Sequence, residues 1–277
     1  MPPQPGPVSP LLPPLYGSLA YQAEVRSVVA ELITHLQPNV AQRVQGIPVS
    51  FESDPNDVNA FAGCDDSGTP FMATTEGFLS AVDAMAQTRA TDEVFGTQTY
   101  EAYMAYVVPR LINDKGSPAL PPGIIAPQHW PDMRRFSRAH QLADEIIAFT
   151  LGHELAHHYL GHTGCANGQA MGGGPSPATL GNLFARVIPA FNQPNELGAD
   201  NAGVMNVLAT GRARQATSYR WTERGGIMLL DFFGRLERAA GSSPLSPMTF
   251  LRTHPNPAFR IPLVQATAQA WRSQNPG

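Results

Sequence analysis

The chain of 277 residues is poor in lysine, in cysteine and in long apolar runs. Lys115 is its only lysine, and its 22 acidic residues outnumber its 18 basic ones. The formal net charge is −4, so the chain lacks the excess of positive charge that is typical of nucleic-acid-binding proteins. We therefore expect no nucleic-acid partner. No apolar run approaches the ~20 residues that a membrane-spanning helix needs, so we expect no transmembrane segment.

The N-terminus also lacks a basic region followed by an apolar core, which is the pattern of a signal peptide. Two locations stay open for this chain: the cytoplasm, or an exported form whose signal has been removed. The two cysteines, Cys64 and Cys165, do not decide between them. They could form a disulfide or remain free thiols, because pairing depends on a Cα separation that the sequence does not give.

The sequence predicts a single domain over residues 17–277, preceded by a proline-rich arm. Residues 1–16 contain seven prolines, which favour an extended and poorly ordered segment. Apolar residues at three- and four-residue steps predict helices over much of the remaining chain. The predicted helices cover residues 19–36, 76–89, 139–160, 179–191, 194–208, 221–240 and 260–270.

Three short segments between turn sequences predict a small antiparallel sheet. These segments are Ile47–Phe51, Val58–Ala62 and Phe71–Thr74, with the second as the return strand of the first. The predicted class is therefore α+β, with helices dominant. Tyrosines at 100, 103 and 106 recur every three residues, a pattern that favours core packing over a lid.

The most informative stretch is an H-E-x-x-H motif, His153-Glu154-Leu155-Ala156-His157, within the predicted helix 139–160. Residues i and i+4 lie on one helix face, so both imidazoles can meet one metal ion. Glu154 lies beside them, close enough to take a proton from a metal-bound water. Zinc with such a water and a carboxylate base is suited to amide hydrolysis. The alternative is a surface helix with two solvated histidines.

A catalytic zinc usually keeps three protein ligands, so one more is required downstream. Glu196 is favoured over His162, because His162 misses the spacing of the metzincin motif and follows the predicted helix end at Gly161. Asp200 lies four residues after Glu196 on the same face, where its carboxylate can accept the N–H of a ligand histidine. The alternative for this acidic pair is a solvated face near a helix start.

These residues resemble those of the gluzincin family that includes HtpX-like proteases and the CAAX prenyl protease. That family carries H-E-x-x-H on one helix and E-x-x-x-D on a second. Asn59-Ala60-Phe61-Ala62 resembles its N-A-F-A segment, and Thr253-His254-Pro255 with Arg260-Ile261 resembles its late T-H-P…R-I segment. The four matches keep the family's order, over residues 44–262.

The resemblance implies a mostly helical, zincin-like metallopeptidase fold with a small sheet beside the active-site helix. It also implies one Zn²⁺ per chain. His153, His157 and Glu196 would be the metal ligands, and Glu154 would be the general base.

Further roles follow from the same resemblance. Asp200 would support a ligand histidine, and Arg260 would be a structural ion-pair partner. His254 would lie near the metal, as a polar group for the transition state or an occasional fourth ligand. One strand would be the sheet edge that pairs with an extended substrate; it consists of Phe71, Met72, Ala73 and Thr74.

The chain departs from this family in three respects. The family's transmembrane helices are absent, and residues 88–138 are longer than the usual link, so we expect an insertion there. The family often has an Arg shortly before the ligand Glu, where this chain has Asn192-Gln193-Pro194-Asn195. We expect a zinc peptidase, most simply an endopeptidase, that acts on peptides or proteins. One alternative is a latent homologue that binds zinc and acts as a binding or chaperone-like protein because His254 occupies the water position. A metal-free helical scaffold is another.

Overall fold

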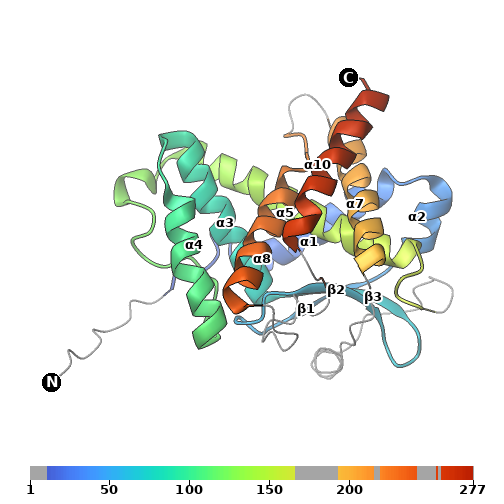
Figure 1. Cartoon of the computed structure of the whole chain (residues 1–277), viewed down its shortest axis with the longest axis horizontal. Coiled ribbons are helices and arrows are strands. Elements are labelled where there is room, and N and C mark those ends of the chain that lie inside the picture. Colours follow the sequence, from blue (N-terminus) through green and yellow to red (C-terminus); the bar gives the residue numbers. More distant parts are fainter. Residues whose placement is uncertain (1–10, 166–192, 215–218, 242–253, 255–256, 277) are drawn as a thin grey trace.

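The computed structural model describes residues 11–165, 193–214, 219–241, 254 and 257–276. Helices dominate this part of the chain and one small sheet accompanies them, as predicted for an α+β protein (Figure 1). The helices are α1 (Ser18–Thr34), α2 (Pro38–Val44), α3 (Glu76–Phe95), α4 (Thr99–Pro109), α5 (Met133–Tyr159), α7 (Gln193–Ala213), α8 (Arg224–Ala240) and α10 (Pro257–Gln274). The strands are β1 (Val49–Glu52), β2 (Ala60–Cys64) and β3 (Pro70–Thr75). The predicted helix 179–191 lies outside the described residues.

The sheet is mixed, so the prediction of an antiparallel sheet is wrong. Its strand order is β1-β3-β2, with β3 parallel to β1 and antiparallel to β2. The segment Phe71, Met72, Ala73 and Thr74 belongs to β3 and is therefore the central strand. Its prediction as the substrate-binding edge is also wrong, because both of its edges are already paired. β2 does not return along β1, since β3 inserts between them.

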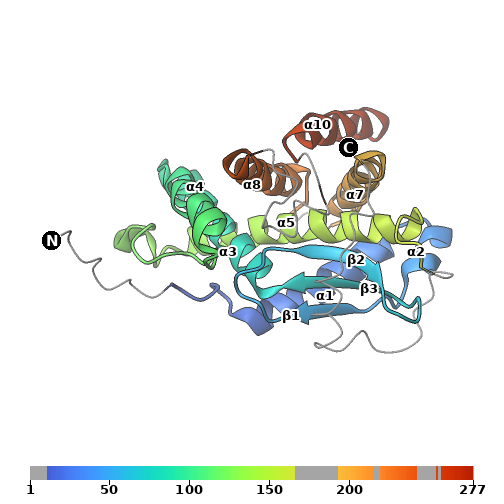
Figure 2. The same cartoon turned by 60° about the horizontal axis from the view of Figure 1, so that its bottom comes forward.

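Among the described strands, β2 has the unpaired edge that lies nearest to α5 (Figure 2). The backbone N–H of Thr75 donates to the carbonyl of Asn59 at 3.0 Å, so these two residues form a hydrogen-bonded pair. Such pairs alternate along an antiparallel ladder. The backbone groups of Ala60, Ala62 and Cys64 therefore point away from β3, toward this outer edge.

Helix α5 is the centre of the fold and packs against α1, α3, α7 and α8 (Figure 2). It begins at Met133, six residues before the predicted start at Ala139, because the Asp132 side chain caps it by accepting the Arg134 N–H at 2.8 Å. Between residues 139 and 159 it is buried at almost every position. The polar side chains of a helix that is buried on nearly all sides cannot reach water, so they need polar partners inside the protein. Such partners together form a buried polar site.

Residues 88–138, which we expected to be an insertion, form part of the main core. Tyr103 and Met104 of α4 are buried in the same cluster as the apolar residues of α3 and α5. The Tyr103 hydroxyl donates to the Pro118 carbonyl at 2.6 Å. Tyr100 is buried as well, so these rings pack in the core as predicted.

The described part of the proline-rich arm is also ordered by contacts. The Leu12 N–H donates to the Leu120 carbonyl, and the Leu15 N–H donates to Asp83, both at 2.9 Å. The side chains of Leu12 and Leu15 pack against the core. The prediction of a poorly ordered segment is therefore wrong for residues 11–16, because two leucines anchor them.

A disulfide joins Cys64 at the end of β2 to Cys165, which follows α5, with the Cα atoms 5.6 Å apart. It fastens the strand with the unpaired edge to the helix that carries H-E-x-x-H. By closing a loop of about 100 residues, it also restricts the unfolded chain and stabilises the fold. Within the described part of the chain, no helix has the length and apolar character needed to cross a membrane.

Candidate metal centre

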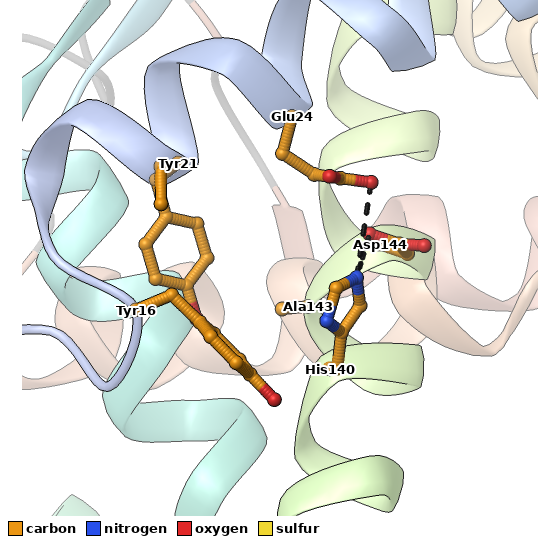
Figure 3. A pocket seen from close by; sticks show the side chains of 7 residues that line it. Tyr16, Tyr21, Glu24, His140, Ala143 and Asp144 are labelled. Carbon is orange, nitrogen blue, oxygen red and sulfur yellow. Dashed lines mark ion pairs between the residues drawn. The ribbon is translucent and has the colours of Figure 1, made fainter.

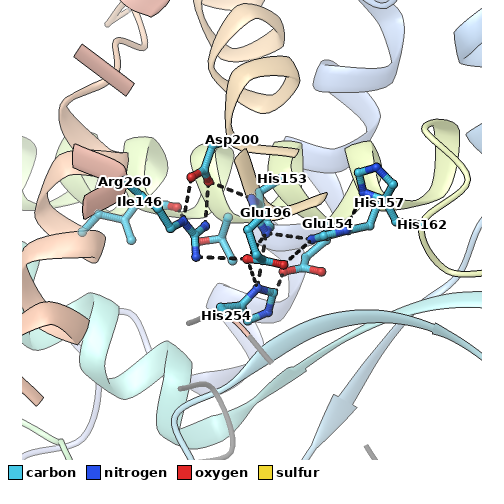
Figure 4. Close-up of polar contacts among 10 residues, drawn as sticks. Ile146, His153, Glu154, His157, His162, Glu196, Asp200, His254 and Arg260 are labelled. Carbon is cyan, nitrogen blue, oxygen red and sulfur yellow. Dashed lines mark hydrogen bonds and ion pairs between the residues drawn. The ribbon is translucent and has the colours of Figure 1, made fainter. Parts of the chain in front are cut away.

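Helices α5 and α7 approach closely enough for their side chains to share one site. At Gly203 of α7, an added Cβ would lie only 2.9 Å from the backbone nitrogen of His153. Glycine is therefore the residue that this crossing accepts. The crossing brings the Glu196 and Asp200 side chains of α7 against the H-E-x-x-H face of α5 (Figure 4).

The two histidines of the motif face each other across this site. The Nε2 atoms of His153 and His157 are 2.9 Å apart, and both rings are at most 3% exposed. The Glu196 carboxylate completes a triangle, with Oε1 at 3.3 Å from His157 Nε2 and Oε2 at 3.5 Å from His153 Nε2. Atoms held ~2.05 Å from a common ion in a tetrahedron lie ~3.3 Å apart, so these separations fit the edges of one coordination sphere.

The Nδ1 atoms of the two rings have polar partners outside the triangle, so the Nε2 atoms are left to face its centre. Asp200 Oδ1 lies 2.9 Å from His153 Nδ1, and a carboxylate there assigns the ring proton to Nδ1. His162 Nδ1 lies 3.0 Å from His157 Nδ1. The two Nε2 lone pairs would then repel each other unless a proton or a cation lies between them. The donor set thus fits a cation better than it fits neutral rings.

Asp200 is held in turn by Arg260 of α10. The guanidinium donates through Nε to Oδ2 at 2.6 Å and through Nη2 to Oδ1 at 2.7 Å, while Nη1 lies 3.0 Å from Glu196 Oε2. All three side chains are at most 2% exposed. One arginine therefore neutralises charge on both carboxylates and fixes their spacing.

His254 and Glu154 occupy the remaining side of the triangle (Figure 4). His254 Nδ1 lies 2.8 Å from Glu196 Oε2 and 3.3 Å from His153 Nε2, and its Nε2 lies 3.6 Å from Glu154 Oε1. The backbone N–H of Ala62 in β2 lies near enough to the Glu154 carboxylate to favour its ionised form, so it slightly lowers the pKa of Glu154. Its Oε2 is buried and has no hydrogen-bond partner within the described ranges. An oxygen in this state is ready to accept a proton or a donor from a ligand.

His162 lies behind His157 instead of joining the triangle, so the preference for Glu196 over His162 agrees with the geometry. The neighbouring His158 points to the sheet, where its Nε2 donates to the Phe71 carbonyl at 3.0 Å. The proximity of Ala62 to Glu154 was not predictable from local patterns, because it depends on the strand order.

The electrostatics of the site favour a positive charge at the triangle. Burial opposes ionisation of Glu196, but His254 and hydrogen bonds from His153 and His157 outweigh it and hold its pKa well below the usual range. Burial would lower the pKa of His153, yet Asp200 and Glu196 raise it to about 10. Burial lowers the pKa of His157 to about 3. One ring thus attracts a proton while the other stays neutral, and a metal cation would satisfy both.

Burial dominates at the remaining carboxylate and raises the pKa of Glu154. A general base needs a pKa nearer neutrality than that of an exposed carboxylate, so this direction suits proton transfer. At Asp200, burial opposes ionisation, but Arg260 outweighs it and lowers the pKa. Asp200 therefore stays an acceptor for the His153 ring.

Comparison of the chain with protein-family models, with curated proteins and with solved structures found no significant match. The chemistry of the site must therefore be inferred from its side chains. The ligand atoms of one buried group lie within 4.8 Å of one another, and this group could hold a metal ion. It consists of His153, His157, Glu196 and His254.

Proposed function

We propose that this protein is a zinc-dependent peptidase with a zincin-like fold, in which His153, His157 and Glu196 bind Zn²⁺. The observation that carries this proposal is the buried triangle of two Nε2 atoms and one carboxylate, with the Glu154 carboxylate beside it. Two imidazoles with one carboxylate are a common ligand set of catalytic zinc. When bound, Zn²⁺ would supply Lewis acidity for a carbonyl oxygen and lower the pKa of a water molecule.

Glu154 is the general base of this proposal. Its carboxylate takes the proton of the attacking water as the scissile carbonyl carbon is attacked, and then gives that proton to the leaving amine. The Ala62 N–H lies near this carboxylate and favours its ionised form. His254, next to both Glu154 and Glu196, contributes a second polar contact for the developing oxyanion.

Asp200 and Arg260 act through the ligands. Asp200 holds the Nδ1 proton of His153 and so fixes the tautomer that presents Nε2. Arg260 bonds to Asp200 and lies against Glu196, so it keeps both carboxylates ionised and in place. This positioning limits the rearrangement needed when a metal binds.

We assign peptide binding to the outer edge of β2, in place of the central strand. The backbone groups of Ala60 and Cys64 point out from this edge, and the Ala62 N–H lies near the general base. Ala60 and Ala62 are at most 4% exposed, so a peptide reaches their backbone groups only after a rearrangement. An extended peptide added to an unpaired strand edge gains main-chain hydrogen bonds that tolerate many side chains. The substrate class that follows is an extended peptide or an unfolded protein segment.

A latent zinc protein is the second candidate, and His254 favours it. Its Nδ1 lies as close to His153 Nε2 and Glu196 as a fourth ligand would. The site residues are also only 0–3% exposed, which leaves little room for a water molecule in this arrangement. Such a protein would bind zinc without hydrolysing peptides.

The disulfide favours the exported alternative for the location of this chain. Disulfides persist in oxidising compartments and are rare in the cytosol. Cys64 and Cys165 form one, which ties the substrate-binding strand to the zinc helix. We therefore propose an oxidising compartment for the folded protein.

Metal removal tests the function directly. Dialysis against a zinc chelator should abolish cleavage of unfolded casein, and one equivalent of Zn²⁺ at the triangle should restore it, because every step needs the Lewis acid. Casein cleavage is followed by release of acid-soluble peptide, with Mg²⁺ added as the control for nonspecific ion effects. Zinc binding without cleavage would support the latent protein, and cleavage that survives chelation would exclude the zinc mechanism.

A further inference from the structure

A second group of metal-binding side chains lies at the other end of α5. His140 and Asp144 are four residues apart on this helix and share one face, and Glu24 of α1 points at them (Figure 3). His140 Nε2 lies 3.5 Å from Asp144 Oδ1 and 3.9 Å from Glu24 Oε1. His140 and His153 are thirteen residues apart on α5, which corresponds to ~20 Å along a helix, so this group is separate from the first centre.

We propose that Glu24, His140 and Asp144 form a second binding site for a divalent transition-metal cation, which links α1 to α5. Their ligand atoms all lie within 4.8 Å of one another. Atoms bound ~2.0–2.2 Å from a common ion lie ~3–4 Å apart, so small side-chain rotations suffice. One imidazole with two carboxylates is a ligand set for Zn²⁺ or Mn²⁺; calcium prefers oxygen ligands alone.

The state of Asp144 points independently to a ligand. The residue is 7% exposed, and its Oδ1 is buried without a hydrogen-bond partner among the residues described. A buried acceptor left in this state is costly, and a cation at the position between Asp144, His140 and Glu24 would satisfy it. The second carboxylate, from Glu24, lies at the same place, and burial and Glu24 together raise the pKa of Asp144 to about 8. A metal cation would take the place of the proton that Asp144 holds there.

The surroundings give the cation room and access. A cavity of about 90 Å³ adjoins the three side chains, enough for an ion and coordinated water. The His140 side chain is 45% exposed and that of Glu24 is 32% exposed, so the cavity is open to solvent. Tyr16 covers one side, with its ring 5.0 Å from that of His140.

One resident positive charge must be considered, that of Arg214. Its influence on the two carboxyls is small: burial dominates at Asp144 and raises its pKa to about 8, and a hydrogen bond with His140 is the main cause that lowers the pKa of Glu24. The Arg214 guanidinium bonds to Glu31 through Nε at 2.7 Å and Nη2 at 2.9 Å. Arg214 therefore neutralises another carboxylate and does not replace the cation.

Stoichiometry tests this site in the full chain. Chelator-treated protein is titrated with Zn²⁺ by calorimetry, and the parent should bind two equivalents. Asp144→Asn and His140→Gln should each lose one equivalent, because each removes a ligand. His35→Gln, a change of the same kind at a histidine outside both groups, should keep two. His153→Ala/His157→Ala should retain the equivalent that belongs to Glu24, His140 and Asp144, and its Zn²⁺-dependent rise in Tm should vanish when Asp144→Asn is added.

This experiment tests the second site and the proposed peptidase centre separately. Zinc bound by the parent and left unchanged by Asp144→Asn and His140→Gln would overturn the second site, whatever happens at the first. Loss of an equivalent in those two variants, with none lost in His153→Ala/His157→Ala, would leave the second site standing and remove the proposed peptidase centre. Because His140 is half-exposed and asparagine replaces an Asp144 carboxyl whose pKa burial raises to about 8, neither variant is expected to unfold the chain.

Discussion

Replacing Glu154 by glutamine should lower the rate of peptide cleavage by about 10²- to 10⁴-fold, the range that general acid–base catalysis contributes. Glutamine has nearly the same shape but cannot take a proton from the attacking water. The metal ligands His153, His157 and Glu196 are untouched, so zinc content should stay unchanged. The measurement is kcat on a fluorogenic peptide, with zinc quantified in the same sample.

The folded state of this variant separates loss of the base from loss of structure. Glu154 is a buried carboxylate whose pKa is raised by burial, so a neutral side chain at this position should not lower Tm. Glu101→Gln, the same replacement at an exposed glutamate, is the control and should leave kcat as it is. Parent-like turnover in Glu154→Gln would remove Glu154 from its assigned role.

Replacing Arg260 by methionine should destabilise the fold by about 3–5 kcal/mol, which is typical when one partner of a buried ion pair is removed. Arg260 bonds twice to Asp200 and lies 3.0 Å from Glu196, and all three residues are at most 2% exposed. Without the guanidinium, two carboxylates remain buried with less compensation. Urea unfolding in the presence of chelator measures this cost without a contribution from bound metal.

The same helix supplies a matched control. Arg272 of α10 pairs with Glu223 at the surface, where its side chain is 49% exposed, so Arg272→Met should cost about 0–1 kcal/mol. In an Asp200→Asn background, Arg260→Met should cost less than it does alone, because one of the stranded charges is already gone. An Arg260→Met variant as stable as Arg272→Met would contradict the role of this network.

Much of the first centre was predictable because it depends on helical spacing. His153 and His157, and likewise Glu196 and Asp200, are four residues apart, and this spacing alone places each pair on one face. That the two faces meet depends on the close approach of α7 at Gly203, which no local pattern reveals. The positions of His254 and Arg260 were suggested only by resemblance to a family, since long-range contacts bring them to the site.

The errors came from features that are not local. Strand order is set by the path of the whole chain, so the sequence did not show that β3 lies between β1 and β2. Helix α2 is only seven residues long, too short for a helical period to stand out. The second cation group was missed because Glu24 is distant in sequence from His140 and Asp144, although the last two share a visible helical spacing.

The central claim is that α5 and α7 hold one zinc ion between His153, His157 and Glu196. Anomalous diffraction at the zinc edge from crystals of zinc-loaded protein tests it most directly. We predict a peak within ~2.0–2.2 Å of both Nε2 atoms and of the Glu196 carboxylate. Zinc-loaded crystals with no peak at this triangle, or with the Glu196 side chain turned away from both rings, would contradict it.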